Sequence, residues 1–418
     1  MRLAGLAAPT SIAAVVLLAA VGGGRVAAGD PSTSTAREPA GALPRISVST
    51  QRRIRDDPKV RATVRVEGSY DGPAGIELRG QSSESFPKKS YGLELRGPNG
   101  KDVRVGLLGM APDGDWVLQG PWTDKTLMRN ALAYDVARMT GRWAAQTRHV
   151  ELHLNGRYEG VYLLTERPEL GDGRIAAAGR GVTGAYLVEW TFQFQARRKG
   201  PHFMLPRSGR PILYEDPELA DLSAAEARYL REYLRRTERA VYAGRGAWRR
   251  FLDEPSTIDY LLVQELFRNV DAFLGSTFLL KEAGRKLRFG PVWDFDLSTG
   301  NARYANSEST LGWWTRSRPW IAQLWRDCRF RARVGERWRR LQRVGLRRGV
   351  LARLDHYARV LEAGPAGRNF RRWPTLHRRL YQSPGPPRGS YRAEVRHLRG
   401  WLIRRMAWID RAAGRLRC

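Results

Sequence analysis

The sequence contains little cysteine, little histidine and no long apolar run beyond its first residues, and each scarcity excludes a class of protein. With two cysteines, Cys328 and Cys418, the chain is not a disulfide scaffold, and the sequence leaves open whether the two pair. His149 and His153 stand four apart in a strand-like segment without a third ligand, so we expect no zinc site there. No later stretch is apolar enough to predict a membrane-spanning helix.

Lysine is also scarce, although positive charge is abundant. Lysine and arginine number 72 against 42 acidic residues, a net charge of +30, and only eight of the 72 are lysines. A chain this basic suits an anionic membrane, an acidic polymer or a nucleic acid. We expect an anionic polymer of the cell envelope as a partner, and no specific nucleic acid. The few lysines, Lys88 and Lys89 among them, are therefore candidates for a functional role.

The N-terminus predicts export. Arg2 supplies a positive charge, residues 12–21 form an apolar run too short to span a bilayer, and small residues follow at 26–28. We therefore expect a signal peptide over 1–28, a linker over 29–45, and a secreted or cell-envelope protein. The alternative is an uncleaved anchor, which the glycines at 22–24 disfavour.

The remaining chain, long enough for two or three domains or one bilobal enzyme, predicts an α+β fold. Short alternating strands dominate residues 46–166, and Asn155-Gly156 between two of them is typical of a tight hairpin. One helix, predicted from Asp124 to Met139, interrupts them, with Asp124 as its cap. From about residue 220 the pattern turns helical, beginning with a capping box of Ser223 and Glu226.

Three aspartates carry the strongest chemical signal. Asp271 precedes an apolar strand-like run, and Asp294 and Asp296 follow 23 (294 − 271) and 25 (296 − 271) residues later. This spacing suits phosphoryl transfer, in which one carboxylate orients the attacking hydroxyl while later ones hold Mg²⁺ or Mn²⁺. We therefore assign Asp271 as the catalytic residue and Asp294 and Asp296 as metal ligands.

Cationic and hydroxyl side chains near the start of the strand region are candidates for binding nucleotide phosphates. The turn from Arg79 through Ser82 and Ser83 either covers phosphates or is a plain hairpin turn, and both interpretations stay open. Lys88 and Lys89 open a strand, where neighbouring side chains face opposite ways, so one of them can reach the α/β-phosphates. Lys89 shares its face with apolar residues and is the favoured nucleotide lysine, with Lys88 in reserve.

Several sequence blocks occur in the order found in one family, and the chain resembles the CotH kinase family, the spore-coat protein H group of atypical protein kinases, over about residues 75–300. The blocks are Ile76–Ser83, Phe86–Tyr91, Leu107–Met110, Asp115–Leu118, Asp124–Asn130, Gly160–Glu166, Gly184–Glu189 and Pro291–Asp296. The resemblance implies a bilobal kinase-like fold with a β-rich N-lobe at 46–166. A mostly helical C-lobe would occupy 167–418, ending in a basic Trp/Arg-rich extension. It also implies transfer of the ATP γ-phosphate to Ser or Thr of a protein substrate.

Two departures from the kinase pattern define the alternative function. Ser276 stands where a kinase catalytic loop has the Asn that binds a second metal, and a hydroxyl is the weaker ligand. The helix after Asp124 contains no Glu to pair with the nucleotide lysine, which leaves Glu94, Glu151 or Glu166 as partners. Glu166 also lies where a hinge would contact adenine. The alternative is therefore a degenerate relative that binds nucleotide or polyanion without turnover.

Overall fold

The computed structural model describes residues 41–80, 82–177, 179, 181–380 and 386–418, without the side chains of Ser82 and Ser83. The expected signal peptide and most of the expected linker lie outside the described residues. The described chain is α+β, with a β-rich N-terminal region and a helical C-terminal region. No helix in the described ranges is long and apolar enough to cross a membrane.

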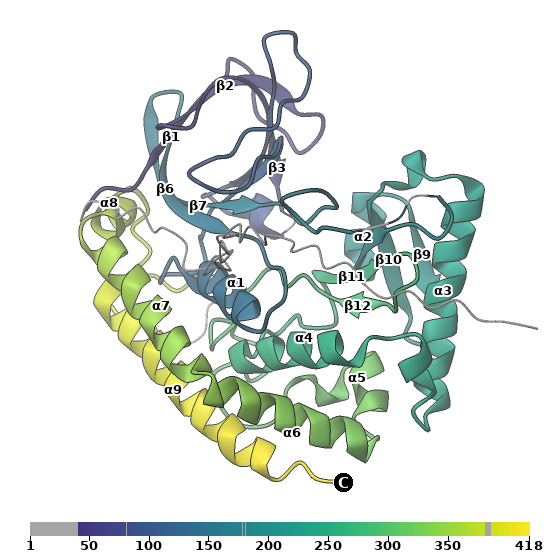
Figure 1. Ribbon diagram of the computed structural model, residues 1–418. Coiled ribbons are helices and arrows are strands. Elements are labelled where there is room, and N and C mark those ends of the chain that lie inside the picture. Colours follow the sequence, from purple (N-terminus) through teal and green to yellow (C-terminus); the bar gives the residue numbers. More distant parts are fainter. Residues whose placement is uncertain (1–40, 81, 178, 180, 381–385) are drawn as a thin grey trace, which may run out of the picture. The chain divides into compact units, whose positions relative to one another are not determined.

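The N-terminal region is a closed seven-stranded barrel (Figure 1) with strand order β1-β2-β3-β4-β5-β7-β6. Its strands are β1 Arg45–Ser49, β2 Val60–Val66, β3 Tyr70–Arg79, β4 Ser90–Leu95, β5 Asp115–Gln119, β6 Thr147–Leu154 and β7 Arg157–Glu166. Neighbouring strands pair antiparallel except β1 and β6, whose parallel pairing closes the barrel. Closure leaves no free sheet edge.

Alternating apolar side chains fill the barrel and explain its register. Val64 and Val66 of β2 are buried while the residues between and beside them face outward, as the two-residue period of a strand requires. Trp116, Tyr91 and Tyr162 are the largest side chains in the same core. The predicted hairpin is confirmed: β6 and β7 flank Asn155 and Gly156, whose φ angles of 49° and 77° are those that a type I′ turn needs.

Helix α1 spans Arg129–Met139 and starts five residues later than predicted. Asp124 lies in the turn before the helix, where its carboxylate accepts hydrogen bonds from the N–H groups of Met128 (3.0 Å) and Arg129 (2.8 Å). Asp124 therefore does satisfy donors at the helix start, but across a compact turn rather than as the adjacent residue. Leu127 in that turn has φ 61°, a conformation that the sequence pattern does not reveal.

A second sheet follows the barrel, so the chain after residue 166 is less helical than predicted. Its order is β12-β11-β8-β10-β9. The strands are β8 Tyr186–Trp190, β9 His202–Leu205, β10 Arg210–Asp216, β11 Thr277–Lys281 and β12 Arg288–Phe289. The strands are short and come from distant parts of the chain, which is why a local pattern does not show that they form one sheet.

Helices pack around this sheet and α1. They are α2 Gln193–Lys199, α3 Ala224–Ala243, α4 Glu254–Phe267, α5 Pro319–Leu324, α6 Cys328–Arg343, α7 Leu346–Glu362, α8 Pro365–Arg372 and α9 Tyr391–Gly414, with 3-10 turns η1 Ser82–Ser85, η2 Leu219–Asp221, η3 Ala247–Arg250 and η4 Thr315–Ser317. The capping box of Ser223 and Glu226 is confirmed at the start of α3. A disulfide joins Cys328 at the start of α6 to Cys418, which follows α9.

Candidate active site

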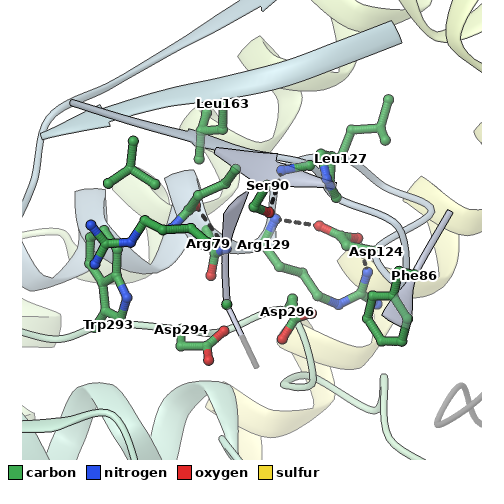
Figure 2. Close-up of a pocket in the computed structure, with 16 residues that line it drawn as sticks. Arg79, Phe86, Ser90, Asp124, Leu127, Arg129, Leu163, Trp293, Asp294 and Asp296 are labelled. Carbon is green, nitrogen blue, oxygen red and sulfur yellow. Dashed lines mark hydrogen bonds and ion pairs between the residues drawn. The ribbon is translucent and has the colours of Figure 1, made fainter. Parts of the chain in front are cut away.

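A pocket of about 120 Å³ lies where β3, β4, β5 and β7 of the barrel meet α1 and the loop after β12 (Figure 2). Arg79, Ser90 and Leu163 contribute from the barrel, Asn130 from α1, and Asp294 and Asp296 from the loop, among other lining residues. Asp271 lies close by, because its charge acts on both loop carboxylates. The fold thus brings together three aspartates that the sequence places up to 25 (296 − 271) residues apart.

Backbone contacts from α1 hold the loop that carries Asp294. The N–H of Asp294 donates to the hydroxyl of Tyr134 (3.3 Å), and the N–H of Phe295 donates to Oδ1 of Asn130 (2.6 Å). The side-chain amide of Asn269 donates to the carbonyl of Asp294 (3.0 Å), which has a left-handed φ of 62°. Sequence reasoning missed Asn130 and Tyr134. Their spacing of four on one helix face was the available signal.

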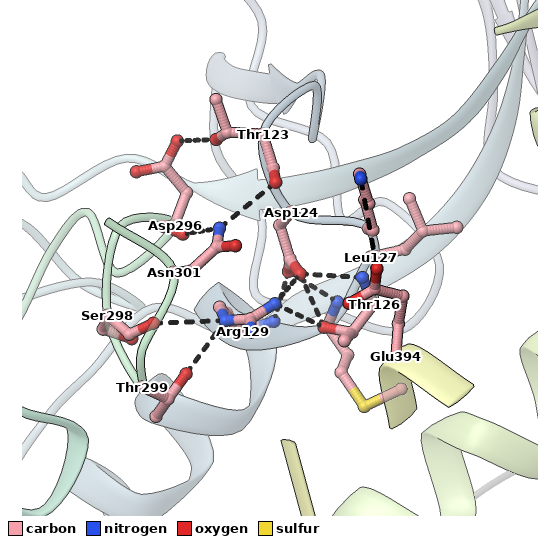
Figure 3. A network of polar contacts seen from close by, with 12 residues as sticks. Thr123, Asp124, Thr126, Leu127, Arg129, Asp296, Ser298, Thr299, Asn301 and Glu394 are labelled. Carbon is pink, nitrogen blue, oxygen red and sulfur yellow. Dashed lines mark hydrogen bonds and ion pairs between the residues drawn. The ribbon is translucent and has the colours of Figure 1, made fainter. Parts of the chain in front are cut away.

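Asp296 is fixed by neutral donors (Figure 3). Its carboxylate accepts from the hydroxyl of Thr123 (2.7 Å), and its carbonyl accepts from the amide of Asn301 (2.6 Å), which also reaches the carbonyl of Thr123 (3.2 Å). Arg129 ties the same loop to α1, donating to Thr299 Oγ1 (2.9 Å) and pairing with Asp124. The position of Asp296 therefore depends on contacts and not on the D-x-D spacing alone.

Burial raises the pKa values of all three aspartates, and the charges of neighbouring aspartates add to the effect at Asp271 and Asp294. Asp294 keeps contact with solvent, but it lies in a recess where the surrounding protein, then Asp296 and Asp271, raise its pKa well above the usual value. Burial also raises the pKa of Asp296, against the hydrogen bond from Thr123. Burial and the charge of Asp296 raise the pKa of Asp271 to about 6, while Arg318 acts in the opposite direction. A cation placed among these groups would relieve the repulsion.

Asp271 and Ser276 occupy one turn before β11. The N–H of Asp271 donates to Oδ1 of Asn269 (3.2 Å), and the carbonyl of Asp271 accepts from Leu274 and Gly275. The hydroxyl of Ser276 lies 3.4 Å from Oδ2 of Asp294, and its N–H donates to Glu189 (3.2 Å). Ser276, with φ 48°, therefore faces the carboxylate that was expected to bind metal.

Neither candidate lysine lines the pocket. Lys88 is buried and donates to the carbonyl of Val161 (2.6 Å) and to Oδ1 of Asn369 (2.7 Å) of α8, and burial lowers its pKa well below the usual value. Lys89 donates to the backbone carbonyl of Glu84. The cations that line the pocket, among the residues described, are Arg79 and Arg129.

The remaining candidates divide between the pocket and the barrel core. Arg79 lies at the pocket, whereas Glu166 is buried at the end of β7 and pairs with Arg174 (3.2 Å). The Glu166 side chain therefore contacts a buried arginine and does not line the pocket. The side chains of Ser82 and Ser83 lie outside the described part; their backbone forms η1. The two other expected lysine partners, Glu94 and Glu151, pair with Lys59 and Arg368 instead.

The donor set fits a weakly coordinated hard cation. Asp294 and Asp296 both line the pocket, and the Ser276 hydroxyl lies beside Asp294. The described residues contain no cluster of three or more histidine, cysteine or acidic side chains suited to a metal. Two carboxylates suffice for Mg²⁺, which keeps several waters and takes further oxygens from substrate phosphates.

An acidic recess with arginines at its wall, between a barrel and a helical region, defines a protein suited to binding a phosphorylated ligand together with a cation. The comparison with family models makes this specific: the chain belongs to the CotH kinase family, since the model of the CotH kinase protein matches residues 76–409. The match continues past residue 300 into the arginine-rich helices, beyond the sequence blocks. No curated protein matches the chain.

Proposed function

We propose that the protein is an exported kinase that transfers the ATP γ-phosphate to Ser or Thr hydroxyls of a protein substrate with a divalent metal. The observation that carries this proposal is the convergence of Asp271, Asp294 and Asp296 beside the pocket, with Arg79 in its wall. We further propose that the barrel corresponds to a kinase N-lobe and the region after Glu166 to the C-lobe.

Each group has a role that follows from its contacts. Asp294 and Asp296 would hold Mg²⁺ or Mn²⁺, which when bound neutralises charge on the nucleotide phosphates. Arg79 lines the pocket, which neither expected lysine does, and would be the phosphate-facing cation. Asp271 accepts a hydrogen bond from the acceptor hydroxyl and takes its proton.

The pKa of Asp271 gives this role a pH dependence. A carboxyl group with a pKa of about 6 is ionised, and able to accept a proton, only above that pH. A cation held by Asp294 and Asp296 would relieve the repulsion that contributes to this pKa, so transfer with bound metal should rise with a midpoint at or below about pH 6, measured as initial rate at saturating nucleotide. A rate that falls as the pH increases through 6 would exclude Asp271 as the proton acceptor.

The disulfide between Cys328 and Cys418 supports the proposed export, because such bonds persist in oxidising compartments. The exposed arginines of α6, α7 and α9 support an anionic envelope polymer as a partner. Binding to such a polymer should weaken steeply with salt and should be unaffected by Asp294→Asn.

The test is transfer of labelled phosphate to a Ser/Thr-rich protein acceptor with Mg²⁺ or Mn²⁺. Wild type should transfer, Asp294→Asn should not, and Glu166→Gln is the matched control because it changes a buried carboxylate outside the pocket. If wild type transfers nothing but ATP with metal still raises its unfolding temperature, the degenerate relative is the correct assignment. Ser276, a weak metal ligand, is the observation that favours that alternative.

A further inference from the structure

Two apolar side chains are exposed beside the turn that carries Asp271. Among the exposed large apolar side chains of the described chain, only Val344 is more exposed than Phe194 (62%) and Leu311 (59%). Phe194 lies on α2, and Leu311 lies in the segment between β12 and α5. Single apolar residues are common on protein surfaces, so their place relative to Asp271 decides whether these two have a role.

Helix α2 packs on the end of this turn, which comprises residues 268–276. A β-carbon at Gly275 would lie 2.5 Å from Cε2 of Phe192, so the Phe192 ring rests directly on the backbone of the turn. The ring of Phe194 stacks on that of Phe192, with centroids 5.6 Å apart and an interplanar angle of 25°. Phe194 is therefore separated from the turn by one ring, and its remaining surface is open to solvent.

The segment that contains Leu311 packs against the start of the same turn. The Arg268 guanidinium donates to the carbonyl of Leu311 (2.8 Å), and the indole N–H of Trp314 donates to the carbonyl of Asn269 (2.8 Å). Asn269 directly precedes Val270 and Asp271. The two exposed side chains thus belong to segments that contact the turn before and after Asp271.

Both segments are held in place by ionic or polar contacts. Arg405 of α9 donates to the carbonyl of Gly312 (2.8 Å), next to Leu311, and Arg198 of α2 pairs with Glu84 (3.0 Å) of η1. A side chain exposed on a fixed backbone is ready to be covered, because a partner that binds it does not have to order a loop.

A cation adjoins Phe194. Arg197 follows Phe194 by three residues on α2, a spacing that places two side chains on one face of a helix. Arg197 is exposed and forms no hydrogen bond or ion pair with any residue that the structure describes. A partner that covers Phe194 therefore gains from a carboxylate beside its apolar side chain.

We propose that Phe194, Arg197 and Leu311 form the surface that binds the acceptor protein. The inference rests on the proposed function and names its substrate class. The acceptor is an extended segment with apolar side chains on both sides of its Ser or Thr and an acidic residue at the end that meets α2. A segment that contacts Phe194 and Leu311 crosses the turn between them, which holds its hydroxyl near Asp271.

The first experiment needs no nucleotide. Immobilised wild type captures peptides from a synthetic pool with a central serine and randomised flanks, and mass spectrometry identifies those retained. They should be enriched in apolar residues on both sides of the serine. Phe194→Ser should lose the enrichment on one side and Leu311→Ser on the other. No enrichment with wild type, or the same enrichment with both variants, would overturn the proposal.

Val344→Ser is the matched control, because it removes an exposed apolar side chain at the end of α6, away from the Asp271 turn. It should retain the same peptides as wild type. A second copy of this chain is the other partner that could cover Phe194. A dimer that sedimentation detects in wild type and that Phe194→Ser dissociates would overturn the proposal in favour of self-association.

The second experiment measures transfer to a retained peptide. Phe194→Ser should raise the KM for the peptide about ten-fold, through loss of one aromatic contact, and leave the KM for ATP unchanged. Arg197→Gln should raise the peptide KM less, and its effect should shrink as salt increases. A fall in kcat with an unchanged peptide KM in Phe194→Ser would show that Phe194 supports the turn and does not bind the acceptor.

The outcomes separate this inference from the proposed function. If peptides with apolar flanks bind wild type and not Phe194→Ser, but none is phosphorylated, the binding surface is correct and the kinase assignment fails. If wild type phosphorylates peptides regardless of their flanks, the kinase assignment is correct and this inference fails.

Discussion

Two clusters of carboxylates in this protein differ in burial and in their counter-ions. At the end of the barrel, Arg174 is fully buried and faces Glu166 (3.2 Å), Glu169 (3.5 Å) and Asp113 (3.7 Å), with its guanidinium over Trp116. At the recess, none of the three aspartates forms a salt bridge with any residue that the structure describes. The recess holds its acids with neutral donors and backbone amides instead.

Arg318, a cation whose charge acts on Asp271, shows why the difference matters. Arg318 acts on Asp271 through its charge, but its guanidinium donates to the carbonyl of Val270 (2.8 Å) and lies over Trp314. Carboxylates buried for folding alone are usually paired, as those around Arg174 are, because an unpaired buried charge is costly. Acids left unpaired at a pocket are therefore the ones available to a cation that arrives with a ligand.

The largest expected effect comes from the paired cluster. Arg174→Met removes the cation from Glu166, Glu169 and Asp113 and should lower the free energy of unfolding by roughly 3–5 kcal/mol, because breaking a buried pair leaves its partners uncompensated. Denaturant unfolding measures this. If the free energy of unfolding fell by less than about 1 kcal/mol, Arg174 would not be the stabilising counter-ion of this cluster.

Loss of a recess carboxylate should act on transfer instead. Asp294→Asn should reduce the rate of phosphate transfer by at least about 10²–10³-fold. The substitution removes a negatively charged metal ligand, and the metal would neutralise the charge on the nucleotide phosphates. Glu166→Gln should leave the rate within a few-fold of wild type. Equal losses in both variants would contradict the assignment of the recess as the active site.

Divalent metal bound with nucleotide should stabilise the folded protein through the recess aspartates, and the carboxylates around Arg174 should not contribute. At about 100 times the dissociation constant, Mg²⁺ or Mn²⁺ with nucleotide should stabilise wild type by roughly 2.7 kcal/mol, seen as a higher unfolding temperature. The shift should vanish in Asp296→Asn, where one of the two ligands is neutral. Persistence of the full shift in that variant would place the metal elsewhere.

The smallest effect concerns the pH dependence of stability. The folded-state pKa of Asp271, about 6, exceeds the ordinary value of about 3.9, so the folded protein loses stability as the pH rises from about 4 through about 6. Asp271→Asn removes that loss and should raise stability at pH 8 by roughly 1–2 kcal/mol, with little change at pH 4. Thermal unfolding at both pH values measures the change in stability. An Asp271→Asn variant less stable than wild type at pH 8 would contradict the prediction.

The difference between the two carboxylate clusters could not be predicted from the sequence. The motif blocks identified the CotH kinase family, which the family model confirms. They could not separate a structural carboxylate from one at the pocket: the sequence predicts Glu166 at a hinge, and the structure shows that it pairs with Arg174. Whether an acid has a counter-ion depends on residues that join it only in the folded chain, so the sequence did not reveal Arg174 as the partner of Glu166.

What the sequence determined by itself is local. Asn155-Gly156 set a hairpin, and Ser223 with Glu226 set a helix start, because turn and cap geometry involve neighbouring residues. Tertiary structure decided the direction of Lys88, whose partner Asn369 is 281 residues away, and the closure of the barrel through β1 and β6. Such contacts form only when burial brings distant segments together, and no local period encodes them.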